Sequence, residues 1–101
     1  MNSEKYLELK IRYDALEREE DKLLCLIDIV LEIRNYDIDE AFRLSQEIIT
    51  RSVQAKFKEG ICRGLNMKGA CYWLKGEYEN GLETLKESLK IAKDLRNDSL
   101  K

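Results

Sequence analysis

The sequence has no proline and no histidine, and only five glycines and three cysteines among its 101 residues. With so few of these residues, the chain has no stretch typical of linkers or disordered tails, so we expect order nearly from end to end. Without histidine it lacks the commonest general base and a common zinc ligand. Cys25, Cys62 and Cys71 show no C-x-x-C spacing. We therefore predict no metal site, no cofactor, and free thiols that pack as small hydrophobic groups.

Long hydrophobic runs are also missing. The longest, residues 23–30, is interrupted by Asp28, and it is far shorter than the roughly 20 residues that a membrane-spanning helix needs. The first residues, MNSEKYLELK, carry acidic side chains where a secretory signal peptide would be basic. Because unpaired cysteines suit a reducing compartment, these features together predict a cytoplasmic protein that does not bind a membrane.

Neither charge sign is in large excess. The 18 basic and 20 acidic residues give a net charge of -2 and alternate along the chain. This pattern offers no basic surface for a phosphate backbone, so we predict no nucleic-acid binding. The chain also lacks a glycine-rich phosphate loop and a nucleophile paired with a base. Carboxylate pairs such as Asp28 with Glu32 are ordinary on helix surfaces, and we predict that the protein is not an enzyme.

The positive signal in the sequence is helical periodicity, within what we take to be a single domain over residues 1–101. Ser3 is a candidate N-cap for an N-terminal helix over residues 4–19, whose apolar stripe consists of Tyr6, Leu9, Tyr13 and Leu16. Residues 22–34 are apolar around most of the helix circumference, which indicates burial between neighbours. A break near residues 19–21 is the interpretation that we favour, and one continuous helix over residues 4–34 is the alternative.

Two helical hairpins are predicted to follow, a first over residues 21–56 and a second over residues 57–96. Asp37 and Glu40 form a capping box for the second helix of the first hairpin. Gly76 is placed to end a helix with positive φ, and we expect the last helix to end at residue 95, before a turn at residues 96–99. When the sequences of the two hairpins are aligned, their second helices match with Ala41 opposite Gly81. Their first helices match with Leu26 opposite Leu65, and this shift along the chain is one residue shorter than the shift between Ala41 and Gly81.

The most specific stretch is residues 62–92, CRGLNMKGACYWLKGEYENGLETLKESLKIA. The tetratricopeptide pattern W-x2-L-G-x2-Y followed by A-x3-F corresponds here to Leu65, Lys68, Gly69 and Tyr72, then Gly81 and Leu85. Residues 22–96 thus resemble tetratricopeptide repeats (TPRs) of the longer type, and especially the N-terminal repeats of bacterial signalling proteins such as nucleotide cyclases, diguanylate cyclases and sensor kinases. The sequence departs from the pattern at Lys68, Gly81 and Ser88, and it lacks the closing proline. Small residues at Gly69, Gly81 and Ser88 would let the two helices approach closely.

The resemblance implies an all-α fold, a right-handed TPR-like superhelix of about five helices made of the N-terminal helix plus two antiparallel hairpins; the alternative is an ordinary helical bundle. Such repeats bind proteins or peptides in a concave groove lined by the first helix of each hairpin. In this register the groove positions are Leu24, Ile27, Asp28, Leu31, Arg63, Asn66, Met67, Ala70 and Trp73. Two alternatives stay open: the N-terminal helix covers Leu24, Ile27 and Leu31, or Trp73 packs against its own hairpin.

We therefore expect a protein or peptide interaction module, a regulatory or scaffold part of a bacterial signalling system. The alternative is a self-associating structural domain, a homodimer through its terminal helices with no ligand groove. Because about three repeats are normally needed for stability, two repeats would leave an open end. The apolar surface expected there is that of Leu85, Ile91 and Leu95.

Overall fold

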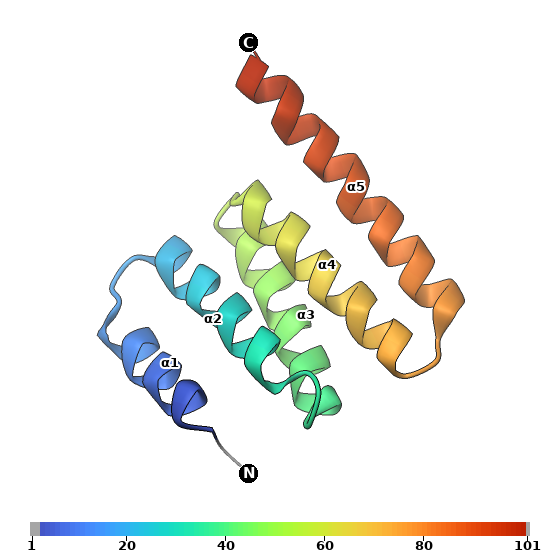
Figure 1. Cartoon of the computed structure of the whole chain (residues 1–101). Coiled ribbons are helices and arrows are strands. Elements are labelled where there is room, and N and C mark those ends of the chain that lie inside the picture. The colour runs from blue at the N-terminus through green and yellow to red at the C-terminus, as the bar shows by residue number, and fades with distance from the viewer. Residues whose placement is uncertain (1–2, 101) are drawn as a thin grey trace.

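The computed structural model describes the backbone of residues 3–100 and the side chains of residues 3–96. This part of the chain is all-α and contains no strand, which confirms the predicted fold class at that level (Figure 1). The five helices are α1 (Glu4–Ala15), α2 (Glu19–Ile33), α3 (Ile38–Gln54), α4 (Lys58–Leu74) and α5 (Tyr78–Leu100). Each helix packs against the next in the chain, and α2 also contacts α4.

The break between α1 and α2 lies earlier than predicted. Helix α1 begins where expected, with Ser3 Oγ accepting the Tyr6 N–H at 3.0 Å, but it ends at Ala15, and Leu16 and Arg18 have extended backbones. The continuous helix over residues 4–34 is therefore wrong. Three acidic residues, 19–21, fill the first turn of α2, where the helix dipole favours negative charge. That acidic cluster was the signal for the helix start.

The spacing of the two hairpins agrees with the superposition of their sequences. Helices α2 and α4 begin at Glu19 and Lys58, which is the same offset as from Leu26 to Leu65. Helices α3 and α5 begin at Ile38 and Tyr78, which is the same offset as from Ala41 to Gly81. In the first hairpin the Asp37 carboxylate accepts the Glu40 N–H at 3.2 Å, as the capping box predicted.

The turns after α3 and α4 use the same hydrogen-bond pattern. Gly76 has a φ of 83°, as predicted, and Lys56 takes the equivalent place with a φ of 55°. The next residue in each turn donates its N–H to the carbonyl five residues earlier: Phe57 to Ser52 and Glu77 to Tyr72, each at 2.8 Å. These bonds are those of a Schellman motif, which satisfies carbonyls at a helix end.

The last helix is longer than predicted. Helix α5 continues to Leu100, so the turn expected at residues 96–99 is wrong. These residues include neither glycine nor proline, and their low helix propensity costs only about 0.7 kcal/mol per residue or less. In Figure 1 the C-terminal end of α5 extends beyond the other helices.

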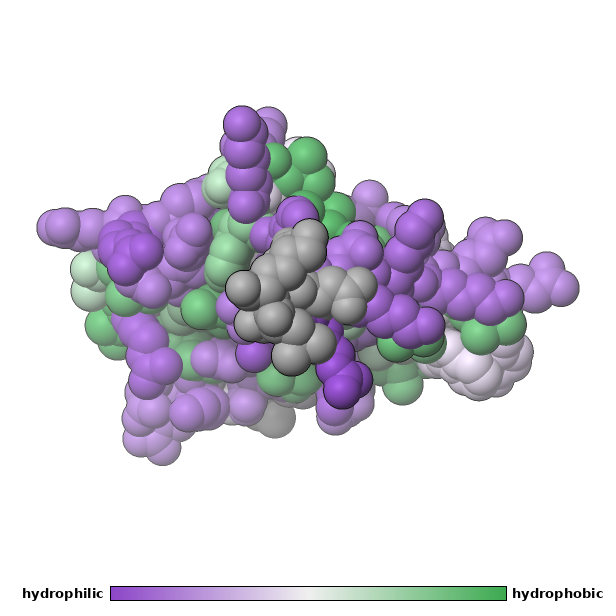
Figure 2. All heavy atoms as spheres, turned by 90° about the horizontal axis from the view of Figure 1, so that it is seen from above, coloured by the Kyte–Doolittle hydropathy of each residue, from purple (hydrophilic) through white to green (hydrophobic). Residues whose placement is uncertain are grey.

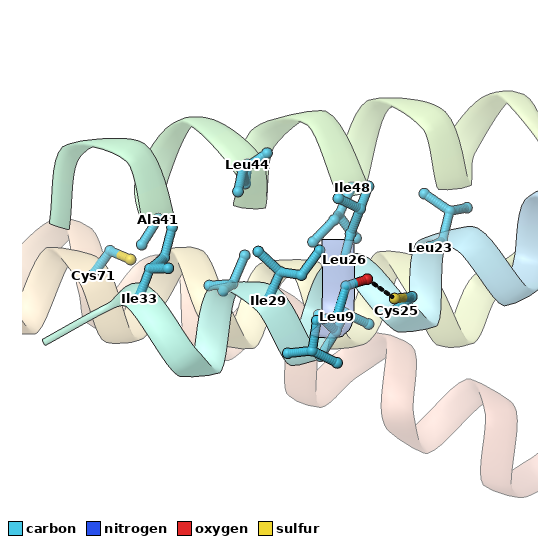
Figure 3. Packing of buried hydrophobic residues seen from close by; sticks show 12 residues of the cluster. Leu9, Leu23, Cys25, Leu26, Ile29, Ile33, Ala41, Leu44, Ile48 and Cys71 are labelled. Carbon is cyan, nitrogen blue, oxygen red and sulfur yellow. Dashed lines mark hydrogen bonds between the residues drawn. The ribbon is translucent and has the colours of Figure 1, made fainter. Parts of the chain in front are cut away.

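The hydrophobic core lies mainly between α1, α2 and α3 (Figure 3). Its buried members are Leu9 of α1, Leu23, Cys25, Leu26, Ile27, Ile29, Val30 and Ile33 of α2, Ala41, Leu44 and Ile48 of α3, and Cys71 of α4. The Cys25 thiol donates to the Leu9 carbonyl at 3.4 Å. No described side chain of α5 belongs to this cluster. Cys25 and Cys71 are buried free thiols, whereas Cys62 is half-buried.

Arg51 fastens the first three helices together at their surface. Its guanidinium donates to both carboxylate oxygens of Glu19 on α2, at 2.7 and 2.9 Å, and to the Tyr13 hydroxyl of α1 at 2.8 Å. A third acceptor is Glu47 on its own helix, at 3.0 Å. The hydrogen bond from Arg51 holds the pKa of Glu19 below its ordinary value.

Candidate interaction surface

The first helices of the two hairpins, α2 and α4, are neighbours. Of the positions predicted to face a groove on α2, Asp28 is exposed and Leu31 is 41% exposed. Ile27 is only 3% exposed and belongs to the core cluster, so its assignment to a partner-binding surface is wrong. Around the helix axis, Ile27 points about 100° away from Asp28 but only about 40° away from Leu23. Leu23 is buried within the protein, so Ile27 is buried with it.

Helix α1 does not fill this surface. It is bound to α2 through the Cys25 thiol and through Ser3, whose hydroxyl donates to Glu32 at 2.9 Å. These residues lie on a different side of α2 from Leu31. Leu24, which is half-buried, and Asp28 line a hollow together with Arg12 of α1. The alternative in which the N-terminal helix covers the α2 positions therefore applies to Leu24 in part and fails for Leu31.

The predicted positions on α4 fall into two groups. Arg63 is exposed and pairs with Glu59 at 3.1 Å, while Asn66 Oδ1 lies 2.6 Å from Ser88 Oγ and is thus engaged by α5. Met67 is half-buried against the core cluster. Ala70 and Trp73 belong to a different place, where the C-terminal ends of α2 and α4 meet α5. Of the nine predicted residues, Leu24 and Asp28 line one hollow and Ala70 and Trp73 line another.

Trp73 is held by its own hairpin yet stays accessible. A Cβ atom on Gly81 would lie 2.8 Å from Trp73 Cδ1, so the indole rests directly on the α5 backbone. The ring of Tyr78 packs against it with centroids 4.7 Å apart. Trp73 nevertheless remains 46% exposed. It is thus a rigid aromatic side chain with one part fixed and another part open to a partner.

Beside Trp73 lies a hollow of about 400 Å³, called here the Trp73 hollow, which is lined by Arg34, Asn35, Ala70, Trp73, Leu74 and Leu85. Leu74 is 53% exposed, and sequence reasoning missed it although it lies one helical turn beyond Ala70. Arg34, also missed, forms no ion pair with any described carboxylate. The hollow thus combines apolar walls with a guanidinium at its rim.

A larger hollow of about 490 Å³ lies at the turn between α2 and α3, lined by Tyr6, Ile33, Tyr36, Asp37, Asp39, Glu40 and Arg43. Its charged groups already have partners. Asp37 caps α3, Glu40 pairs with Arg43 at 2.6 Å, and Asp39 pairs with Lys75 at 3.4 Å. Hydrogen bonding from Arg43 also lowers the pKa of Glu40. We interpret this acidic hollow as part of the fold rather than as a binding site.

The described residues offer few other sites. They contain no group of three or more cysteine, aspartate or glutamate side chains placed to hold a metal ion. No helix among them has the length and apolar character to cross a membrane. On the face shown in Figure 2 the surface is mostly hydrophilic, with smaller hydrophobic areas between the charged side chains. A place where exposed apolar side chains gather is therefore informative about binding.

Comparison of the chain with protein-family models, with curated proteins and with solved structures finds no match. A function must consequently be inferred from the arrangement of this chain's own residues.

Proposed function

We propose that the chain is a protein-interaction module built from two TPR-like hairpins in a right-handed superhelix, and that it binds an apolar, acidic segment of a partner protein at the Trp73 hollow. The observation that carries the proposal is the rigid, half-exposed indole of Trp73 beside this hollow.

The repeat part of the proposal is supported by the spacing of the helices and by their packing. The helix starts at Glu19 and Ile38 recur at Lys58 and Tyr78, with nearly the same separation within each hairpin. The first helices of successive hairpins, α2 and α4, are in contact. This is the arrangement expected of stacked helical hairpins, in which each unit packs mainly on its neighbours.

The binding part is supported by the chemistry of the lining. Tryptophan and arginine are enriched among residues that dominate binding energies, and Trp73 loses little conformational freedom on binding because Gly81 and Tyr78 already hold it. Leu74 and Leu85 supply apolar contact. The guanidinium of Arg34 can form a paired hydrogen bond with a carboxylate. A partner segment with a large apolar residue next to an acidic one fits this lining.

The resemblance to repeats of bacterial signalling proteins extends the proposal to a regulatory or scaffold role in such a system. In that setting the partner is a segment of another signalling protein rather than a small molecule.

The test is selection of peptides from a random displayed library on the purified chain. Trp73 is the only tryptophan, so a peptide bound in the hollow changes the intrinsic fluorescence directly. We expect selected peptides to combine apolar and acidic residues. Leu74→Ser and Arg34→Glu should each weaken their binding by about tenfold or more, which is about 1.4 kcal/mol.

The matched control is Ile11→Ser, because Ile11 is 71% exposed on α1 and does not line the hollow. This change should leave peptide affinity unaltered. The proposal fails if selected peptides bind the Leu74→Ser chain as well as the original one, or if their binding leaves the fluorescence of Trp73 unchanged.

A further inference from the structure

Helix α5 packs with small residues inward and leaves two of its leucines exposed. Gly81, Thr84 and Ser88 are buried against the rest of the protein, whereas Leu82 is 49% and Leu89 57% exposed. An amphipathic helix that covers a core shows the reverse arrangement. The apolar face of α5 is therefore left without a partner within the described part of the chain.

Specific contacts fix α5 in this orientation. Ser88 Oγ lies 2.9 Å from the Cys62 carbonyl and 2.6 Å from Asn66 Oδ1, so its proton serves one of two acceptors on α4. A Cβ atom on Gly69 would lie 2.8 Å from the Leu85 side chain. The close approach predicted from Gly69, Gly81 and Ser88 is thus confirmed, and it prevents α5 from rotating its leucines toward α4.

The apolar residues exposed on α5 differ from those that the sequence predicted at the open end of the second repeat. Ile91 and Leu95 are half-buried, and Leu85 is also half-buried at the edge of the Trp73 hollow. The exposed residues are instead Leu82 and Leu89. With Leu85, which packs on Gly69 at the border with α4, they form a leucine seam with spacings of three and four residues, the spacing of helices that pair along their length.

A row of exposed charges runs beside this leucine seam. In the N-terminal half of α5 the row is acidic, with Glu79 and Glu83. Toward the C-terminal end it is basic, with Lys86, Lys90 and Lys93. No described residue forms an ion pair with any of them. The exposed charges of α3 differ in this respect, since Arg43 pairs with both Glu40 and Glu47.

We propose that α5 pairs antiparallel with α5 of a second copy of this chain, burying the two leucine seams against each other. In this arrangement the acidic half of each row, Glu79 and Glu83, faces the basic half of the other, Lys90 and Lys93. In a parallel pairing each row would instead lie beside the opposite flank of the other leucine seam, so the two rows would not meet. An antiparallel pair has two-fold symmetry and closes on itself, which limits the assembly to a dimer.

The same symmetry makes a distinctive prediction for Lys86. It lies midway between Glu79 and Lys93, so near the two-fold axis it meets the Lys86 of the other copy. This contact between like charges weakens the dimer. Lys86→Gln should therefore strengthen self-association. A dimer in which Lys86 lies far from the two-fold axis would not show this effect.

The test is sedimentation equilibrium of the full chain over a range of concentrations, with circular dichroism to check folding. We expect a monomer–dimer equilibrium, weakened about tenfold or more by Leu82→Ser with Leu89→Ser. Glu79→Lys with Glu83→Lys makes the row basic throughout, and Lys90→Glu with Lys93→Glu makes it acidic at every position except Lys86. Each double variant should associate poorly alone, while an equimolar mixture should form heterodimers.

Two further variants complete the design. Combining all four charge changes restores antiparallel complementarity and should restore the dimer. Glu87→Lys is the matched control, because Glu87 lies on the opposite side of α5 from the leucine seam, and it should leave association unchanged. A monomer at every concentration overturns the proposal. So does a dimer that survives loss of both leucines in a folded chain, or a mixture of the charge variants that stays monomeric.

This proposal does not depend on peptide binding at the Trp73 hollow. Ile11→Ser, Arg34→Glu and the peptide assay report on the hollow, whereas the charge variants of α5 report on the dimer. Leu85 lies at both surfaces and is changed in neither test, so each set of variants reports on its own proposal.

Discussion

The first hairpin with α1 and the second hairpin share a backbone arrangement but are held by different chemistry. Helices α1, α2 and α3 enclose a core in which Leu23, Ile48 and Val30 are fully buried. The interface between α4 and α5 instead relies on glycine and serine at close approach, with Gly69 under Leu85 and Ser88 bonded to α4. The same hairpin geometry can thus place its leucines inside the protein or leave them for a partner.

The surface charges follow the same division. On α3, Arg43 and Arg51 form ion pairs, and the Arg51 side chain, only 21% exposed, reaches α1 and α2. On α5 the charges beside the leucine seam have no described partner. We infer that the charges beside the leucine seam of α5 are arranged for association.

The largest expected difference between the two halves is the cost of losing an apolar side chain. Ile48→Ala should lower the free energy of unfolding by about 2–5 kcal/mol, because it removes buried methyl groups and leaves a cavity. Leu89→Ala, on the open face of α5, should change it by about 0.5 kcal/mol or less in dilute solution. Urea denaturation of both variants, followed by circular dichroism, measures the contrast.

The concentration dependence sharpens this comparison. At high concentration Leu89→Ala should become destabilising, because stability then includes the free energy of association. Equal costs for Ile48→Ala and Leu89→Ala in dilute solution would show that α5 leucines are core residues and would contradict this division between the halves.

A smaller effect is expected from the ion pairs that fasten the first half. Arg51→Gln should cost about 1 kcal/mol at neutral pH, because the arginine contacts Glu19 through two hydrogen bonds and has limited exposure. Arg18→Gln is the control, since Arg18 pairs with Glu20 at 3.4 Å with a side chain 74% exposed, and it should have little effect.

The same variant should change the response to acid. The folded-state pKa of Glu19 lies below its ordinary value of 4.5, so this carboxylate stabilises the fold above pH 4.5 and loses that contribution as the pH falls through the lowered pKa. The unfolding free energy of Arg51→Gln should therefore fall less between about pH 6 and about pH 3 than that of the unmodified chain. Parallel pH profiles for the two proteins would contradict this role of Arg51.

The sequence predicts where helices lie better than which of their sides pack, for a physical reason. Apolar periodicity identifies helices, and Asp37 and Gly76 mark their ends because capping and positive φ demand particular residues. Periodicity does not say which side of a helix meets which neighbour. It therefore placed Ile27 on a groove although that side of α2 is buried. It also predicted Ile91 and Leu95 at the open end, although close contacts of Ser88 and Gly81 turn Leu82 and Leu89 outward.

The end of α3 shows the same limit at a turn. The sequence has no glycine there, yet Lys56 adopts the left-handed conformation that Gly76 adopts after α4. Tertiary packing on both sides of the turn holds this less favourable backbone, and a single sequence carries no mark of it.

The smallest effects expected should come from these two turns, and they should have opposite signs. Gly76→Ala should lower the free energy of unfolding by about 1 kcal/mol, since a side chain disfavours positive φ. A Cβ at Gly76 meets nothing within 4 Å, so this cost is one of backbone conformation alone. Lys56→Gly should raise stability by about 0.5 kcal/mol, because the relief of left-handed strain exceeds the added entropy of the unfolded chain.

Urea denaturation of both variants at low protein concentration provides the measurement. Lys56→Ala is the matched control, because it keeps a Cβ in the same conformation and removes only the charged part of the side chain; it should leave stability nearly unchanged. If Lys56→Gly were destabilising while Lys56→Ala were neutral, strain would not be what distinguishes the turn after α3. The two turns would then share hydrogen bonds without sharing an energetic cost.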